Sequence, residues 1–99
     1  MIYVLTHVDI PPAMVDEGTE LLLQFVASSR QSPGLVRSAL LRQVARKNHF
    51  ELLWVWRTQT DYEQHLRNPG TRRFREQLRP LLGSPVLDRV HAPVDLAVR

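Results

Sequence analysis

The segment that most constrains the fold is 50–56, FELLWVW, because it carries apolar residues at both its even-numbered and its odd-numbered positions. Successive side chains of a strand point to opposite faces. One face carries Leu53 and Val55, and the other carries a larger set: Phe50, Leu52, Trp54 and Trp56. A strand that is apolar on both faces is covered on both faces. A chain of 99 residues can cover one face with its own helices, so we expect a second subunit on the other.

Three further segments have strand patterns. Residues 2–9, IYVLTHVD, are rich in β-branched and aromatic residues. Residues 35–44, LVRSALLRQV, are mostly apolar and carry two arginines for solvent, and residues 86–91, VLDRVH, form a short apolar run after a Gly-Ser-Pro stop. With 50–56 these segments predict four strands.

Helical spacing of apolar residues predicts two helices between the strands. The first runs from Met14 to about Ser29, and the SPG sequence that follows ends it. The second covers 60–66 and 71–82, and the intervening NPG sequence breaks it. Thr58 or Thr60 is the candidate N-cap, since a hydroxyl there can accept from a free backbone N–H of the first turn.

The element order is therefore strand, helix, strand, strand, broken helix, strand. Two β-α-β halves of this kind predict an α+β fold, a ferredoxin-like four-stranded antiparallel sheet with its helices on one face. We expect a single domain over 1–99, in which 92–99 form a C-terminal tail. The bare face of the sheet is the predicted homodimer surface.

Composition excludes several classes of function. The chain has no cysteine, which excludes disulfides, thiolate metal sites and cysteine nucleophiles. No apolar run approaches the roughly 20 residues that span a bilayer, and no signal peptide is evident, so we expect a cytoplasmic protein without a membrane partner. A net charge of +3 spread over the chain does not indicate a nucleic-acid partner. No glycine-rich nucleotide motif is present, and we expect no cofactor.

The segment after 50–56 carries the candidate site residues. Trp54 is more typical of a core residue, whereas Trp56 fits a core or a site equally well, because it ends its strand, where a pocket between sheet and helices would open. Tyr62 and His65 are three residues apart and share one helix face. His65 has two interpretations: a buried imidazole bonded to the backbone, or an acid/base group that titrates near neutral pH.

Other candidates lie outside this segment. Arg75 is at the margin of its helix's apolar stripe, where its head can fold inward and stabilise an oxyanion or enolate. His7 is in mid-strand and can face either the pocket or the dimer surface. His7 and His65 are a possible metal-ligand pair, but without a placed carboxylate the pattern does not indicate a metal. His49 and His91 are expected at the surface, and Gly18 either allows close packing or leaves room for a flat ligand.

The element order, the SPG sequence before the second strand, the tryptophan-containing third strand and the run Trp56, Tyr62, His65 and Asn68-Pro69 together resemble the antibiotic biosynthesis monooxygenase superfamily. The resemblance extends from Ile2 to about His91. It implies a dimeric α/β barrel. Members of this superfamily include cofactor-independent quinone-forming monooxygenases, haem degraders and isomerases, so the resemblance does not identify the reaction.

The resemblance to the phenol-oxidising members carries over at Trp56, Tyr62 and, with a one-residue shift, Arg75. Those members have polar residues at the positions that Leu40 and Leu52 occupy here. The two leucines cannot form the hydrogen bonds that would hold a phenolate. The haem degraders' pattern fails on the first strand, which reads Thr6-His7, and in the second helix, so haem degradation is not expected.

We therefore predict a cofactor-independent monooxygenase that binds a small aromatic or quinone-like ligand. His65 is the predicted proton acceptor, Arg75 the anion holder, and Trp56 and Tyr62 complete the catalytic set. The predicted substrate contacts are five further residues: Phe25, Leu40, Leu52, Trp54 and His7. The alternatives are a non-catalytic dimer that binds a small ligand in the same pocket, and an interaction module whose aromatic residues are only core.

Overall fold

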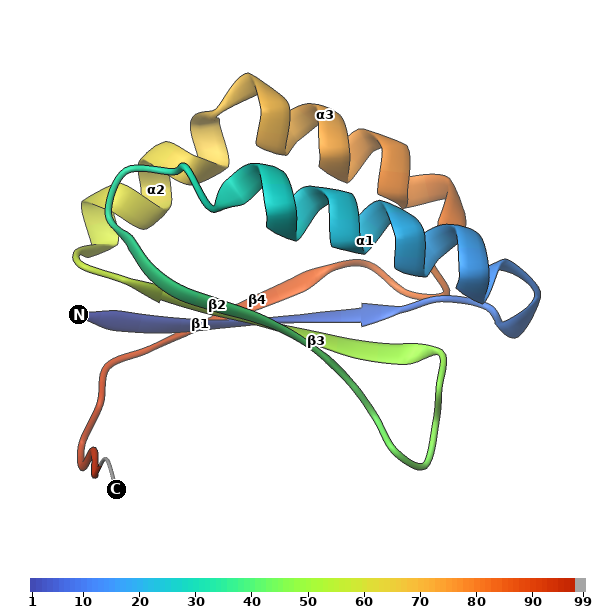
Figure 1. Cartoon of the computed structure of the whole chain (residues 1–99), viewed down its shortest axis with the longest axis horizontal. Coiled ribbons are helices and arrows are strands. Elements are labelled where there is room, and N and C mark those ends of the chain that lie inside the picture. Colours follow the sequence, from blue (N-terminus) through green and yellow to red (C-terminus); the bar gives the residue numbers. More distant parts are fainter. Residues whose placement is uncertain (98–99) are drawn as a thin grey trace.

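The computed structural model, which describes residues 1–97, is a four-stranded antiparallel sheet covered on one face by helices (Figure 1). The strands are β1 (Ile2–Asp9), β2 (Leu35–Arg42), β3 (His49–Trp56) and β4 (Leu87–His91). The helices are α1 (Val15–Ser29), α2 (Gln59–Arg67) and α3 (Pro69–Leu78), with short 3₁₀ turns η1 (Pro12–Met14) and η2 (Arg79–Leu81). The α+β ferredoxin-like prediction is confirmed. The final two residues of the predicted 92–99 tail lie outside the described residues.

The strand order in the sheet is β2-β3-β1-β4, so β3 and β1 are the central strands. Their register aligns a row of residues across the whole sheet on the helix-covered face. Leu40 is opposite Leu52, Leu52 is opposite Thr6, and Thr6 is opposite Asp88. The half of this row on β2 and β3, Leu40 and Leu52, is apolar, and the half on β1 and β4, Thr6 and Asp88, is polar.

The two apolar faces of β3 are confirmed. Phe50, Leu52, Trp54 and Trp56 are each at most 3% exposed beneath the helices. On the opposite face Val55 is buried and Leu53 is half-buried. Three leucines of that face, which we call the open face, stay exposed on the neighbouring strands: Leu5, Leu41 and Leu87.

Helix α1 begins at Val15, one residue later than predicted, because Met14 ends the 3₁₀ turn that follows the proline pair. Its buried stripe includes Gly18, Leu22 and Phe25. A Cβ at Gly18 would clash with the Cδ1 atom of fully buried Ile10. Of the two interpretations of Gly18, the structure therefore supports close packing over space for a ligand.

Thr58 is the N-cap of α2, since its hydroxyl accepts from the Asp61 backbone N–H at 3.1 Å. The NPG sequence does more than interrupt the helix. Asn68 caps α3 by accepting from the Gly70 N–H at 2.8 Å, and Pro69 occupies the first turn, where its missing N–H costs nothing. Helix α3 consequently begins two residues earlier than predicted.

Strand β2 ends at Arg42, short of the predicted 44, and β3 begins at His49, which was expected at the surface of the turn. His49 is instead half-buried and paired with Asp9 across the ladder. His91 is exposed at the end of β4, as predicted. Within residues 1–97 no helix combines the length and apolar character that crossing a membrane requires.

Candidate functional site

Asp88 is the centre of a polar network on the helix-covered face of the sheet. Its Oδ1 atom accepts from the Thr6 hydroxyl at 2.7 Å. Its Oδ2 atom accepts from the Tyr62 hydroxyl and from an Arg75 NH2 group, both at 2.8 Å. Trp54 extends the network, because its indole N–H donates to Thr6 Oγ1 at 3.3 Å. Strand β1 and helices α2 and α3 thus each contribute one donor to the carboxylate on β4, and β3 adds a donor to Thr6.

The positions of these groups follow from the elements that carry them. Asp88 is opposite Thr6 in the β4–β1 ladder, so both point toward the helices. Tyr62 lies on α2 above this row, and Arg75 reaches down from α3. The carboxylate side chain is 14% exposed and the Arg75 side chain 30%, so the ion pair is shielded from water on most sides. Such a charge-assisted bond fixes both groups.

Two buried N–H groups next to this network have no hydrogen-bond partner within the described chain. They are Trp56 Nε1 and Arg75 Nε. A buried donor without a partner is costly, so an acceptor that reached either group would recover stabilisation. The two groups are therefore candidates for contact with a bound molecule.

His65 is packed among aromatic rings. Its ring centroid lies 4.8 Å from that of Trp56, 5.3 Å from Trp54 and 5.8 Å from Phe25. Its Nδ1 atom is 3.4 Å from the Thr71 hydroxyl. Burial, and secondly the charge of Arg75, lower the pKa of His65 to about 4. The imidazole is therefore neutral at physiological pH.

Tyr62 is a neutral phenol held by its neighbours. Burial, followed by its hydrogen bond to Asp88, raises the pKa of the Tyr62 hydroxyl well above its usual value. The group consequently acts as a hydrogen-bond donor and keeps its proton.

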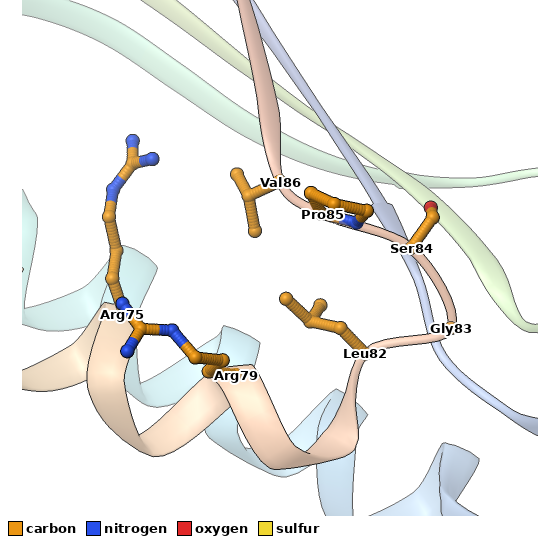
Figure 2. Close-up of a pocket in the computed structure, with 7 residues that line it drawn as sticks. All are labelled: Arg75, Arg79, Leu82, Gly83, Ser84, Pro85 and Val86. Carbon is orange, nitrogen blue, oxygen red and sulfur yellow. The ribbon is translucent and has the colours of Figure 1, made fainter.

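A cavity of about 520 Å³ opens beside Arg75, between the end of α3 and the segment that leads into β4 (Figure 2). Arg75 and Arg79 line one side, and Leu82 and Val86 point into it from the other. His65 borders a different and smaller pocket of about 180 Å³ near Asp61 and Asn68. Trp56 is 0% exposed and lines neither of these two pockets.

The structure brings most predicted site residues together. Trp54, Trp56, Tyr62, His65 and Phe25 belong to one aromatic cluster, which the ring contacts connect. Arg75 joins this cluster through Asp88 and Tyr62. Leu40 and Leu52 are opposite each other on the same face and form its apolar floor.

His7 lies outside this group of residues, on the open face of the sheet, and its role as a substrate contact stays a prediction. The β1 register places it opposite Glu51 on the open face, because Thr6 takes the helix-facing position. Its hydrogen bond to Glu51 raises the pKa of His7, as does its contact with Asp9, against an opposing effect of burial. Among residues 1–97, the metal-ligating side chains that gather within reach of one ion are His7, Asp9 and His49, on this face.

The sequence analysis did not identify Asp88, Thr6 or Thr71 as site residues. A signal existed for Asp88, since in VLDRVH it is an acidic residue at the same strand parity as Val86 and Val90. Its partners come from sequence positions 13 to 82 residues away. Such distant pairings cannot be read from local spacing.

The chain and its fold have recognisable relatives. Residues 1–77 match the family model described as antibiotic biosynthesis monooxygenase. A search of curated proteins finds no significant match to this chain. A candidate antibiotic biosynthesis monooxygenase from Deinococcus radiodurans superposes with a TM-score of 0.91 at 15% identity, covering 100% of this chain and 98% of that one.

Two further solved structures are similar. A protein of Mycobacterium tuberculosis gives a TM-score of 0.89 at 23% identity, covering 98% of each chain. SnoaB, a cofactor-independent oxygenase from Streptomyces nogalater, gives 0.85 at 20% identity, covering 96% of this chain and 94% of its own. At these identities the likeness extends to the fold and not to the reaction.

Proposed function

Because the chain belongs to the antibiotic biosynthesis monooxygenase family, we propose that it is a cofactor-independent monooxygenase acting on a small aromatic or quinone-like substrate. The observation that carries the proposal is the position of Arg75. Its guanidinium is bonded to Asp88 and also lines the cavity of about 520 Å³. A preoriented cation at the wall of a partly apolar cavity suits an enolate or phenolate.

The reaction we propose uses molecular oxygen as the oxidant and the substrate as the reductant. An acidic C–H or O–H of the substrate loses a proton, and Arg75 stabilises the resulting anion. The electron-rich anion then reacts with oxygen. For an anthrone, a methylene carbon becomes a carbonyl carbon, one oxygen atom enters the product, and the other leaves as water.

His65 is the proposed proton acceptor, because it is neutral and lies against Trp56. Part of the lowering of its pKa comes from the Arg75 charge. A bound anion that neutralised Arg75 would raise the basicity of His65 toward the working pH, as general-base catalysis requires. Asp88 is a positioning residue, since its two oxygens already accept three hydrogen bonds.

The cavity beside Arg75 does not include His65 among its lining residues. The proposal therefore requires the substrate to extend from the cavity toward the aromatic cluster, or a proton relay through Tyr62. The second route is chemically weaker because Tyr62 holds its proton strongly. We favour the first route, in which Trp56 Nε1 and Arg75 Nε gain the acceptors that they lack.

A second candidate function is a dimer that binds a small ligand without transforming it. The observation that favours it is the completeness of the Asp88 network, in which the Tyr62 hydroxyl is already satisfied. In that case Arg75 binds an anionic ligand, and His65 is only a packed core residue. Ligand binding without oxygen consumption distinguishes this function from the first.

We further propose that the active form is a homodimer that pairs the open faces of two sheets. Leu5, Leu41 and Leu87 are 37%, 52% and 49% exposed there. Their burial against a second copy would complete the cover that the two-faced strand β3 requires. This arrangement corresponds to the dimeric α/β barrel.

Oxygen consumption with a panel of hydroquinones and anthrones tests the proposed reaction. We expect uptake that depends on protein and substrate, accompanied by formation of the corresponding quinone. Absence of uptake across the panel would remove the monooxygenase proposal. Quenching of tryptophan fluorescence by the same compounds under those conditions would then support the ligand-binding alternative.

Arg75 and Arg79 offer a matched pair of variants, since both line the cavity but Arg79 is exposed and, among residues 1–97, pairs with Glu76. Arg75→Met should lower kcat/KM by about 100-fold, the usual effect of losing an oxyanion-stabilising donor. Arg79→Met should leave it within about threefold, because exposed ion pairs contribute little. Arg75→Lys keeps the charge without the planar fork and should give an intermediate rate. Equal effects at 75 and 79 would contradict the role of Arg75.

A further inference from the structure

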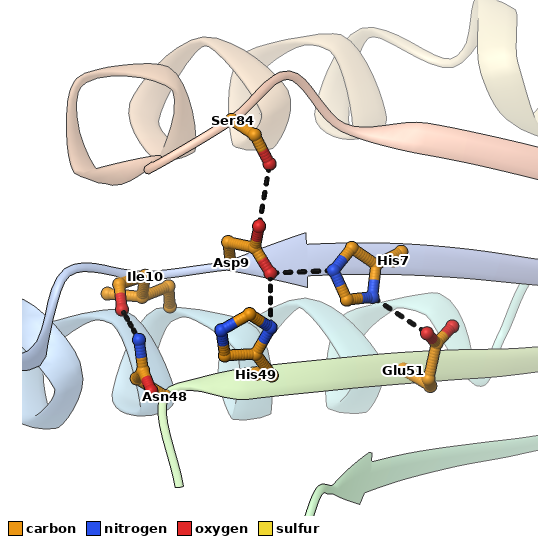
Figure 3. Close-up of polar contacts among 7 residues, drawn as sticks. All are labelled: His7, Asp9, Ile10, Asn48, His49, Glu51 and Ser84. Atoms are coloured by element: carbon orange, nitrogen blue, oxygen red, sulfur yellow. Dashed lines mark hydrogen bonds and ion pairs between the residues drawn. The ribbon is translucent and has the colours of Figure 1, made fainter. Parts of the chain in front are cut away.

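Four polar side chains form a second cluster on the open face, separate from the Asp88 network (Figure 3). They belong to two neighbouring cross-strand pairs at one end of the β1–β3 ladder. His7 is opposite Glu51, and Asp9 is opposite His49. Because residues two apart in a strand share a face, both pairs point in the same direction.

The ligating atoms of this cluster converge on one oxygen. Asp9 Oδ1 lies 2.6 Å from His7 Nε2 and 2.7 Å from His49 Nδ1. One ligand atom from each of the three residues lies within 4.8 Å of the others. Tetrahedral ligands at zinc's usual bond lengths are about 3.4 Å apart. Small side-chain rotations would therefore open a position for one ion between them.

The surroundings of the three ligands match what metal sites use to orient their ligands. Glu51 Oε1 is 2.7 Å from His7 Nδ1, the ring nitrogen that points away from the cluster. A carboxylate behind a ligating histidine fixes its tautomer and ring orientation. The Ser84 hydroxyl donates to Asp9 Oδ2 at 2.8 Å and so holds the carboxylate with Oδ1 directed at His7 and His49.

The backbone beside the cluster is also held in place. Asn48, immediately before His49, donates its side-chain amide to the Ile10 carbonyl at 2.8 Å. The backbone carbonyl of Asn48 accepts from the Ile10 backbone N–H at 2.9 Å. These bonds clamp the ends of β1 and β3 together, so the separation of Asp9 and His49 is fixed before any ion binds. A preorganised ligand set lowers the cost of binding.

We propose that His7 Nε2, Asp9 Oδ1 and His49 Nδ1 bind a divalent first-row transition metal ion, with Glu51 as the residue that orients His7. Two imidazoles and one carboxylate suit zinc, cobalt, nickel or iron better than magnesium or calcium, which prefer oxygen ligands. Three protein ligands leave a coordination position for water or another small ligand. In the single chain these side chains are 18% to 33% exposed.

This site shares no residue with the Asp88 network, and it lies on the open face that the proposed homodimer pairs. The sequence analysis paired His7 with His65 and found no placed carboxylate. The structure pairs His7 with His49 instead and adds Asp9. On metal binding, the two contacts between imidazole nitrogens and Asp9 would be replaced by nitrogen–metal–oxygen bridges.

Titration of the tag-free full chain with Co²⁺, followed by visible absorption, tests the proposal. We expect ligand-field bands that saturate at one Co²⁺ per protomer and that disappear when Zn²⁺ displaces the Co²⁺. We also expect Zn²⁺ to raise the Tm of the protein. Absence of these bands at saturating Co²⁺ would overturn the proposal whatever the variants do.

His49 and His91 supply a matched pair of histidine variants. His49→Gln should lose the bands, and Glu51→Gln should weaken Co²⁺ binding by about 10- to 100-fold, the usual effect of an outer-shell change. His91→Gln, at an exposed position of β4, should bind like the wild type. Far-UV circular dichroism checks that each variant is folded. Bands that persist in folded His49→Gln, or disappear with His91→Gln, would place the metal elsewhere and overturn the assignment.

Discussion

At the residue scale, the central feature of the candidate site is a neutral histidine kept neutral by its surroundings. His65 is 7% exposed, and its pKa of about 4 lies below the ordinary value of 6.5. Between these two pH values the unfolded chain binds a proton at this residue and the folded chain does not. Acidification through this window therefore favours the unfolded state.

Urea unfolding at several pH values between 7.5 and 4.5 measures this effect. The His65 contribution should lower the free energy of unfolding by up to about 1.4 kcal/mol per pH unit below 6.5. His65→Gln should lose that part of the slope, whereas His91→Gln, at an exposed position, should keep it. Parallel curves for wild type and His65→Gln would show that the folded chain protonates His65 as readily as the unfolded one.

Some of the site residues could be placed from the sequence, and others could not. Trp56, Tyr62 and His65 could be grouped because strand end and helix face follow from local periodicity. The side taken by His7 could not be predicted, since Thr6 and His7 are both polar and either parity of β1 presents apolar residues. Thr6 faces inward because it bonds Asp88, a residue 82 positions away.

At the element scale, the loop between β3 and α2 determines how Tyr62 and His65 are presented. Thr58 ends the extended segment and caps α2 through the Asp61 N–H. The sequence left Thr58 and Thr60 as alternatives because both precede the apolar residues of the helix. The backbone decides between them, since only the residue before the first helical turn can offer its hydroxyl to a free N–H.

Thr58→Ala should consequently lower the free energy of unfolding by about 1 kcal/mol. Thr60→Ala is the matched control, because Thr60 already lies within the first turn of α2, and it should change stability by less than about 0.5 kcal/mol. Chemical denaturation monitored by circular dichroism measures both. The reverse order of the two effects would contradict the assigned cap.

At the scale of the whole molecule, the order of strands and helices followed from pattern alone, because two β-α-β halves have few ways to form one antiparallel sheet. The Ser84–Asp9 contact, which ties the segment before the last strand to the end of the first strand, could not be predicted from the sequence pattern. The cover of the open face depends on a second chain. It stays a prediction based on exposed leucines of β1, β2 and β4.

Sedimentation velocity tests that prediction. We expect the wild type to be a dimer at micromolar concentration and Leu5→Arg to be a monomer, because an arginine head would be buried in an apolar interface. Leu23→Arg is the control, since Leu23 is similarly exposed (50%) but lies on α1, on the helix side. A monomeric wild type would contradict the dimer proposal.

The position of a bound aromatic molecule tests the proposed role of the Arg75 cavity most directly. A crystal structure with anthraquinone should place the ligand in the cavity bounded by Arg75, Leu82 and Val86. We expect a quinone oxygen within about 3.2 Å of an Arg75 nitrogen. Ligand density confined to the open face, with the Arg75 cavity empty, would contradict the account.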